Sequence, residues 1–314
     1  MPPPAWPVAA GLAAGLAADA VLGDPGRLHP VAGFGTVAAA LERTAYGDSR
    51  ARGAAYTAIL TGTVAAAGAL AQRAVRRPLP RAAVTALAVW SVVGGTSLRR
   101  EARRIADALQ DGDVDAARLR LPHLCGRDPS SLSEAGLARA TVESVAENTS
   151  DAVVGPLVWG AVAGIPGLVA YRAVNTLDAM VGHRSPRYER FGWAAARLDD
   201  AANLVPARLT AALVTALAPV VGGRPSHALR AWRRDGRKHP SPNAGPVEAA
   251  FAGALGRTLG GQLSYAGRVE DRPLLGDGPT PAVQDIARAA RLSAAVSTAA
   301  GAAAVAVRLI LDRR

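Results

Sequence analysis

Hydrophobic and polar positions along the chain separate into long blocks, with apolar stretches divided by polar segments rich in arginine. The apolar stretches cover residues 5–23, 53–71, 82–98, 152–171, 209–223 and 293–311. A helix that crosses a membrane needs about 20 apolar residues. We therefore expect four of the stretches to span a bilayer, namely 5–23, 53–71, 82–98 and 293–311.

The other two apolar stretches contain helix-breaking residues. Pro156, Gly164 and Pro166 interrupt 152–171, and Pro219 lies within the short stretch 209–223. Such breaks are tolerated at membrane depth only where the backbone is buried in protein or lines a cavity. We predict that both are re-entrant or protein-buried helices.

The polar blocks also have helical periodicity. One apolar face is formed by Leu98, Ala102, Ile105 and Leu109. Ser131 and Glu134 have capping-box spacing, which predicts that a helix begins there. No segment shows convincing strand alternation, and Pro- and Gly-rich linkers are expected at 222–225, 239–246 and 272–281. The sequence predicts one all-α, polytopic membrane domain over residues 1–314.

Composition agrees with a membrane protein. Half of the 314 residues are apolar, and the mean hydropathy is +0.14. The net charge of +11 comes almost entirely from arginine, which membrane proteins keep in cytoplasmic loops. Basic residues do not alternate with aromatic ones, so nucleic-acid binding is not expected. Cys125 is the only cysteine, which excludes an internal disulfide and a cysteine-rich zinc site.

The polar blocks 99–151, 172–208 and 224–292 contain nearly all the candidate chemistry, so we expect them on one side of the membrane. With the N-terminus outside, these blocks and residues 24–52 fall in the cytoplasm, as the positive-inside rule prefers. The arginine-containing loop 72–81 would then lie outside, contrary to that rule.

The first candidate site precedes the apolar stretch 152–171. Glu143, Glu147 and Asp151 are spaced four apart and would share one helix face, with Asn148 beside them. Like charges at this spacing repel unless a cation lies between them. Mg²⁺ is a suitable cation because it takes carboxylate oxygens together with substrate phosphates. A solvated acidic face is the alternative, but ionisable groups beside a membrane segment are usually functional.

Two further segments carry polar side chains at helical spacing. The first segment contains three pairs at helical spacing: Asn175 with Asp178, Arg197 with Asp200, and Asp199 with Asn203. These pairs are either ordinary surface pairs or parts of a buried site, and we prefer the buried site. The later loop holds Lys238, His239, Ser241 and Asn243, followed by a helix predicted to begin near Pro246 with Glu248 in its first turn. Free amides at a helix start together with Lys238, the only lysine, predict an anion site. A surface lysine and a loop histidine are the simpler alternative.

Ordered motifs across nearly the whole chain closely resemble the CobD/CbiB family of cobalamin biosynthesis. They are GDPxRLHPV at 23–31, RDxSxL at 127–132, ESVAENTSD at 143–151, AYRAVNTLDAMVGHR at 170–184, FGWAAARLDD at 191–200, NLVPARLTA at 203–211 and, later, KHPSPNAG and GALGRTLGG. Departures are small. Pro129 stands where Thr is expected, Ala152 where Gly is expected, and His183 where Tyr is common, and only Pro129 puts a hydroxyl contact in doubt.

The resemblance implies an integral-membrane adenosylcobinamide-phosphate synthase. Such an enzyme joins a propionate carboxyl of its corrinoid substrate, adenosylcobyric acid, to (R)-1-amino-2-propanol or its O-phosphate. A carboxylate needs activation before an amine attacks it, and MgATP is the expected source, through an acyl phosphate.

The expected roles follow from that chemistry. Glu143, Glu147 and Asp151 would hold Mg²⁺, with help from Asp178 or Asp200. Lys238 and Arg197 would neutralise phosphate oxygens, and Arg172 or Arg184 would hold the phosphate of the amine. His239 or Glu147 would act as the base. Substrate binding is also expected from Asn148, Asn175, Asp199, Asn203, Ser241 and Asn243. Trp159, Tyr171 and Trp193 would pack against the corrinoid ring or anchor the protein at the membrane interface.

The expected location is the cell membrane, with several spans and a cytoplasmic active side. Besides lipid, other membrane enzymes of cobalamin assembly are expected partners. Two alternatives remain from other functional classes. One is a non-catalytic membrane regulator of the AmpE type, and the other is a corrinoid or polyamine transporter with charges buried between broken helices.

Overall fold

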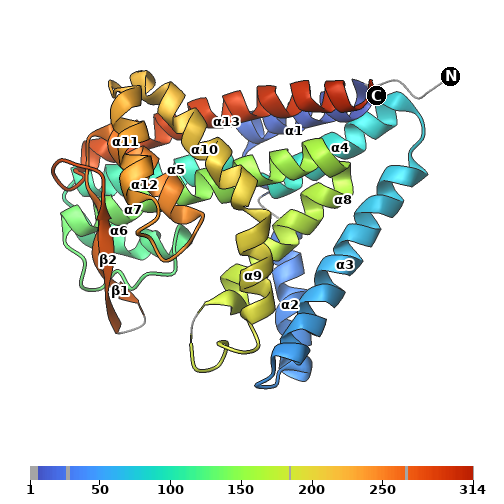
Figure 1. The fold of residues 1–314 in the computed structure, drawn as a ribbon, viewed down its shortest axis with the longest axis horizontal. Helices are drawn as coiled ribbons and strands as arrows, with labels where there is room; N and C mark the ends of the chain where they lie inside the picture. The colour runs from blue at the N-terminus through green and yellow to red at the C-terminus, as the bar shows by residue number, and fades with distance from the viewer. Residues whose placement is uncertain (1–5, 26–28, 184, 266–267, 314) are drawn as a thin grey trace. The chain divides into compact units, whose positions relative to one another are not determined.

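The computed structural model describes residues 6–25, 29–183, 185–265 and 268–313, which are almost entirely helical (Figure 1). Where the sequence predicts one domain, the chain groups into two compact units that alternate along it. Unit 1 comprises residues 1–94, 151–203 and 300–314, and unit 2 comprises 95–150 and 204–299. Each unit is described by itself below.

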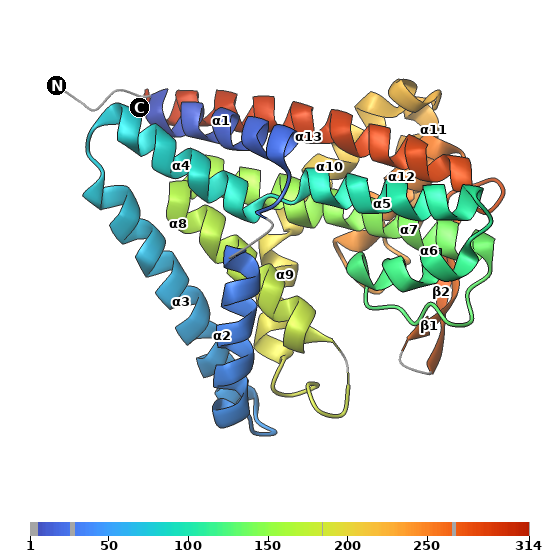
Figure 2. The same ribbon diagram turned by 180° about the vertical axis from the view of Figure 1, so that it is seen from behind.

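Unit 1 is a bundle of apolar helices. It contains α1 (Trp6–Leu22), α2 (Pro30–Ala45), α3 (Arg50–Ala74), α4 (Pro78–Val92), most of η2 (Ser150–Val154), α8 (Gly155–Leu177), η3 (Asp178–Gly182), α9 (Trp193–Ala202) and the end of α13 (Val283–Leu311). Helices α1 and α4 lie side by side in both ribbon views (Figures 1 and 2). A Cβ atom at Gly11 or Gly15 of α1 would overlap α4, so small residues permit this close approach.

A second packing region of unit 1 is a core of aromatic and aliphatic side chains. Tyr56 of α3 and Phe191, just before α9, are fully buried and lie 5.1 Å apart between ring centroids. Leu177 and Val181 complete this core from the end of α8 and from η3. The core fixes α9 against α3 and α8, which positions the polar side chains of α8 and α9 described below.

Unit 2 is built around a buried helix of small residues. It contains α5 (Gly95–Gln110), α6 (Val114–Arg120), η1 (Leu121–His123), α7 (Glu134–Thr149), α10 (Leu204–Leu217), η4 (Ala218–Val221), α11 (Pro225–Asp235), α12 (Ala244–Leu255), β1 (Leu259–Tyr265), β2 (Arg268–Leu275) and the first part of α13. Every residue of α12 is buried, and α7, α10 and α11 pack around it. The predicted apolar face of α5 is confirmed, since Leu98, Ala102, Ile105 and Leu109 are all buried.

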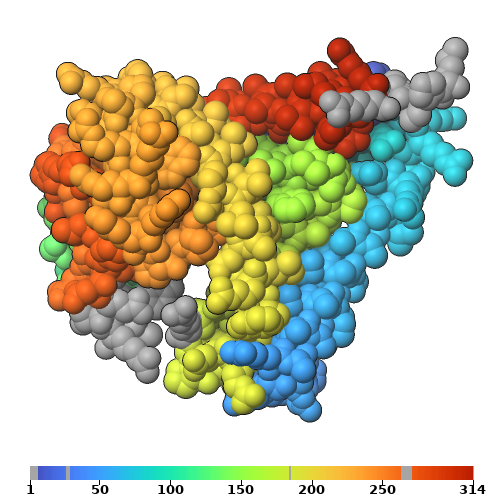
Figure 3. Space-filling view, in the orientation of Figure 1, coloured from blue at the N-terminus to red at the C-terminus, as the bar shows by residue number. Residues whose placement is uncertain are grey.

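Five helical stretches among the described residues are long and apolar enough to cross a membrane. They are Arg50–Ala74, Pro78–Gln110, Glu134–Gly182, Leu204–Val221 and Val283–Leu311. Helix α1 is apolar but shorter, with 17 residues. The prediction of an all-α polytopic membrane protein is confirmed. Exposed apolar side chains such as Ile59 and Leu70 lie on α3, which forms part of the surface in Figure 3 (blue).

The predicted break within 152–171 is present as a kink in α8. Gly164 has φ 68° and ψ −150°, outside helical geometry, two residues before Pro166. The side chain of Gln72 in α3 compensates locally, because its Oε1 accepts a hydrogen bond from the Ile165 backbone nitrogen at 2.9 Å. The re-entrant assignment of 152–171 and 209–223 stays a prediction, because both lie in stretches long enough to cross.

Three local predictions are wrong. The first is Ser131 as the N-cap of α7. The N-cap is Ser133, whose Oγ accepts a hydrogen bond from the Gly136 backbone nitrogen at 3.2 Å. Ser131 instead belongs to a preceding turn, which the hydrogen bond from Leu132 N to the Pro129 carbonyl oxygen closes. Helix α12 begins at Ala244, which places Glu248 beyond its first turn.

The third error concerns strands, since β1 and β2 form an antiparallel hairpin that extends into the predicted linker 272–281. Alternation does not reveal it, because Gly260 and Gly261 interrupt β1 with φ 84° and Pro273 interrupts β2.

Candidate functional site

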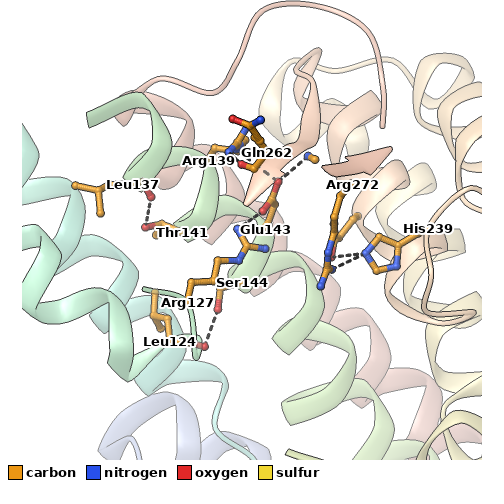
Figure 4. A network of polar contacts seen from close by, with 12 residues as sticks. Leu124, Arg127, Leu137, Arg139, Thr141, Glu143, Ser144, His239, Gln262 and Arg272 are labelled. Carbon is orange, nitrogen blue, oxygen red and sulfur yellow. Dashed lines mark hydrogen bonds and ion pairs between the residues drawn. The ribbon is translucent and has the colours of Figure 1, made fainter. Parts of the chain in front are cut away.

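A cluster of ionisable groups in unit 2 is centred on Glu143 of α7 (Figure 4). Glu143 is 1% exposed, and its carboxylate accepts hydrogen bonds from Arg127 and from the Gly260 backbone nitrogen, the latter at 2.7 Å. Arg139, one turn earlier, approaches the same carboxylate at 4.0 Å and donates to the Gln262 carbonyl oxygen at 2.7 Å. These contacts join α7 to the hairpin and to the segment before α7.

Glu147 lies one turn after Glu143 and differs from it in exposure. Its side chain is exposed, whereas Glu143 is buried with both carboxylate oxygens engaged. Arg127 and Arg272 are the cations that interact electrostatically with Glu147. Glu147 is therefore the carboxylate of this pair that a ligand can reach.

Glu248 and His239 complete this group, which we call the glutamate cluster: Glu143, Glu147, Glu248, Arg127, Arg139, Arg272 and His239. Burial raises the pKa of Glu248 well above its usual range, and the nearby carboxylates of Glu143 and Glu147 add to the effect. A neutral Glu248 avoids placing a further uncompensated charge in the interior of unit 2.

Burial and the Arg272 guanidinium lower the pKa of His239 to about 4. His239 Nε2 lies 2.9 Å from Arg272 Nη1 and 4.0 Å from Glu248 Oε1. A guanidinium can only donate, so the neutral ring accepts at Nε2; its Nδ1 lies 3.0 Å from the Ser241 backbone nitrogen and 3.4 Å from the Ser241 carbonyl oxygen. His239 is therefore neutral at physiological pH.

Carboxylate and carboxamide side chains gather in unit 1, in a group that we call the carboxamide cluster: Asp151, Asn175, Asp199 and Asn203. The sequence predicts a buried site for Asn175, Asp199 and Asn203, but it places Asp151 on the helix face of Glu143 and Glu147. Helix α7 ends at Thr149, so Asp151 lies in η2 and contacts Asn175 instead. Asn203 Nδ2 donates to Asp199 at 3.0 Å, and Asn175 Nδ2 lies 3.4 Å from both Asp199 and Asp151. Tyr171 donates its hydroxyl to Asn203 Oδ1 at 2.7 Å. Elements η2, α8 and α9 thus contribute to one partly buried polar network.

Arg172 borders the carboxamide cluster. Its Nη1 contacts Asn175 Oδ1 at 3.4 Å, while its buried Nε has no hydrogen-bond partner among the described residues. An unpartnered buried donor is costly, and anion binding is one way to satisfy it. This observation agrees with the expectation that Arg172 contacts a substrate phosphate, which stays a prediction.

Other predicted site residues have ordinary structural partners. Lys238 Nζ pairs with the buried carboxylate of Asp235 at 2.8 Å, and Asp235 also accepts from Arg234 and from Gly276 N. Ser241 Oγ accepts hydrogen bonds from the backbone nitrogens of Asn243 and Ala244, so these two amides at the start of α12 are already occupied.

The remaining predicted residues are dispersed. Arg197 and Asp200 form a surface pair at 3.8 Å, which contributes little to stability. Asp178 lies in η3 beside Gly182, and Asn148 donates to the Ser144 carbonyl oxygen at 3.0 Å. Arg184 lies outside the described residues.

The grouping of the carboxylate side chains decides whether the predicted Mg²⁺ site is supported. Among the described residues, no three His, Cys, Asp or Glu side chains are grouped so that they could hold a metal ion. The geometry therefore gives no support to a cage of three carboxylates. Mg²⁺ commonly binds through one or two carboxylates plus substrate phosphates, and the accessible Glu147 is suited to that mode.

Sequence reasoning missed the cations of the glutamate cluster. Arg127 and Arg272 come from separate parts of the chain, and in an arginine-rich sequence nothing distinguishes them from surface arginines. Arg139 precedes Glu143 by four residues, which is the spacing of a helical ion pair, so its position was a signal. A second signal was that a buried carboxylate such as Glu143 requires a cationic partner. Arg127, in the motif at 127–132, was a candidate for that partner.

Buried ionisable groups among helices of membrane-spanning length define a polytopic membrane protein with buried polar clusters. A family model described as CobD/Cbib protein matches residues 12–293. The chain therefore belongs to the CobD/CbiB family, as its motifs predict, and is a protein of cobalamin biosynthesis.

Relatives match over nearly the whole length. A cobalamin biosynthesis protein CobD of Mycobacterium tuberculosis is 57% identical over 306 residues, covering 98% of this chain and 97% of the relative. The protein of the same name from Chromobacterium violaceum is 47% identical over 284 residues, covering 87% and 88%. No solved structure gives a significant match.

Proposed function

We propose that the protein is an adenosylcobinamide-phosphate synthase. It forms the amide bond between a propionate carboxyl of adenosylcobyric acid and (R)-1-amino-2-propanol or its O-phosphate. Family membership supports the pathway, and one observation supports the chemistry. Glu147 is an accessible carboxylate beside Arg127 and Arg272, in a setting suited to polyphosphate and Mg²⁺.

In this proposal MgATP would transfer its γ-phosphoryl group to the propionate carboxylate, which releases ADP and gives an acyl phosphate. Attack by the amine would then form the amide bond and release inorganic phosphate. Glu147 would hold the Mg²⁺ ion that accompanies the nucleotide. Arg127 and Arg272 offset the negative charge of the phosphates, and Glu143 positions Arg127 through their buried ion pair. These groups perform the positioning and charge neutralisation that phosphoryl transfer requires.

The amine arrives as an ammonium ion and must lose a proton before it attacks. His239 is neutral and so can accept a proton, but its low pKa makes it a weak base. Glu147 is the stronger candidate base when it is not bound to metal. We place the chemistry in the cell membrane with the polar blocks on the cytoplasmic side.

The test uses detergent-purified protein with adenosylcobyric acid and either amine, with and without MgATP, and detection of the condensed corrinoid by mass spectrometry. Glu147→Gln is compared with Glu134→Gln, an exposed glutamate on the same helix. We expect a MgATP-dependent product from the wild type and from Glu134→Gln, and loss of at least about 100-fold for Glu147→Gln. Folded protein that forms no product with either amine would contradict the proposal and favour a regulator or a transporter.

A further inference from the structure

A small cavity in unit 2 lies among α10, the end of α11, and the loop that leads into α12. It has a volume of about 230 Å³. Its lining includes Arg208, Arg237 and His239, with Pro240, Pro242 and Pro246. None of the candidate roles considered so far uses Arg208 or Arg237.

The cavity carries uncompensated positive charge. Two arginines line it, and no acidic residue does. Asp235 is the nearby carboxylate in the sequence, but Arg234 and Lys238 already pair with it. In the described part of the chain, Arg237 forms no ion pair. The charge balance therefore favours an anionic ligand.

The guanidinium of Arg208 is preorganised for such a ligand. Its Nη1 donates to Asn243 Oδ1 at 2.6 Å and to the Leu204 carbonyl oxygen at 3.3 Å. Both contacts use the same nitrogen, which leaves Nε and Nη2 for a ligand. Neighbouring donors in a fixed planar group match the geometry of phosphate oxygens.

The walls of the cavity are stiff. Pro240 and Pro242 restrict the loop, Pro246 lies in the first turn of α12, and Ser241 Oγ accepts hydrogen bonds from the backbone nitrogens of Asn243 and Ala244. Gly245 allows close packing as well, since a Cβ there would overlap the Gly236 carbonyl oxygen and His239. A site that is rigid before binding loses less entropy when its ligand arrives.

We propose that this cavity binds the phosphate group of a small phosphate monoester, with Arg208 and Arg237 as the anion-binding residues. Its volume is below the range of about 300–1,000 Å³ that is typical for larger ligands, which favours a small monoester over a whole nucleotide. The identity of the ligand rests on the proposed function, in which aminopropanol O-phosphate is the small phosphorylated substrate.

The test measures binding directly, without the corrinoid, by calorimetry on detergent-purified protein. The ligands are aminopropanol O-phosphate, inorganic phosphate, ATP and unphosphorylated aminopropanol. Arg237→Ala and Arg208→Gln are compared with Arg233→Ala, which removes an exposed arginine of α11 that does not line the cavity. Because Arg237 is exposed and unpaired within the described residues, its replacement should leave folding intact.

We expect either cavity variant to weaken binding of aminopropanol O-phosphate by about tenfold or more, and Arg233→Ala to leave it unchanged. Loss of ATP binding with intact binding of the monoester would overturn the assignment in favour of the nucleotide. Equal affinity in all proteins, or no phosphate binding by the wild type, would also overturn it. If binding is lost as expected while the wild type forms no amide product, the synthase proposal fails and the phosphate site stands.

Discussion

Two glutamates one turn apart on α7 have different environments, and their variants should therefore behave differently. Glu143 is buried in an ion pair with Arg127, so Glu143→Gln leaves a buried guanidinium without its charge partner. We expect a loss of about 3 kcal/mol in unfolding free energy. Glu147 is exposed, so Glu147→Gln should change stability by less than about 0.5 kcal/mol.

Thermal unfolding in detergent, with Glu134→Gln as a further exposed control, distinguishes the two glutamates. Equal stability of the Glu143 and Glu147 variants would show that the buried ion pair does not stabilise unit 2. The same proteins serve the product assay, where Glu147→Gln should be the folded but inactive member of the set.

Acid should destabilise the fold through His239. Its folded pKa of about 4 lies below the ordinary value of 6.5, so the unfolded chain takes up the proton first as the pH falls. Stability is fully present above pH 6.5 and declines toward pH 4. Unfolding of the wild type and of His239→Asn, followed from pH 7.5 to 4, should show a steeper decline for the wild type. Parallel curves would contradict a neutral, buried His239.

At the scale of elements, the kink in α8 depends on one glycine. Gly164 occupies a conformation reserved almost entirely for glycine, and a Cβ there would overlap the Gln72 amide. Gly164→Ala should therefore destabilise the protein by about 1–3 kcal/mol. Gly62→Ala is the matched control, because Gly62 lies inside α3 with open space around it.

The control substitution should be neutral or stabilising by up to about 1 kcal/mol, because alanine favours a helix more than glycine does. Thermal unfolding of both variants in the same detergent tests this. A Gly164→Ala protein as stable as the wild type would mean that the kink straightens without cost.

Helices were predictable where one buried face gives the sequence a helical spacing of apolar residues, as in α5, but the β-hairpin was not. Its glycines and Pro273 interrupt alternation, and Gly260 instead provides a backbone nitrogen for Glu143. The gathering of Asn175, Asp199 and Asn203 was predictable, since polar side chains repeated among apolar neighbours need hydrogen-bond partners. Two of the cations around Glu143, Arg127 and Arg272, were not predictable, because they lie far from Glu143 in sequence and meet it only in the folded chain.

At the scale of the whole molecule, the single cysteine makes the predicted topology testable. In a Cys125→Ser background, Arg76→Cys lies in the loop expected outside and Thr280→Cys in a block expected in the cytoplasm; both replaced side chains are exposed. A membrane-impermeant maleimide applied to intact cells should label only the first. Labelling of residue 280 alone would reverse the orientation.

The order in which the chain is synthesised gives α13 particular importance. Its residues before 300 belong to unit 2, and those from 300 onward belong to unit 1. Arg288 on this helix donates to the carbonyl oxygens of Leu255 and Val221, at the ends of α12 and η4. Domains usually fold one after another as the ribosome releases them, but here neither unit is complete until α13 has emerged, because each contains part of that helix. During translation neither unit can therefore complete its packing before α13 has been synthesised.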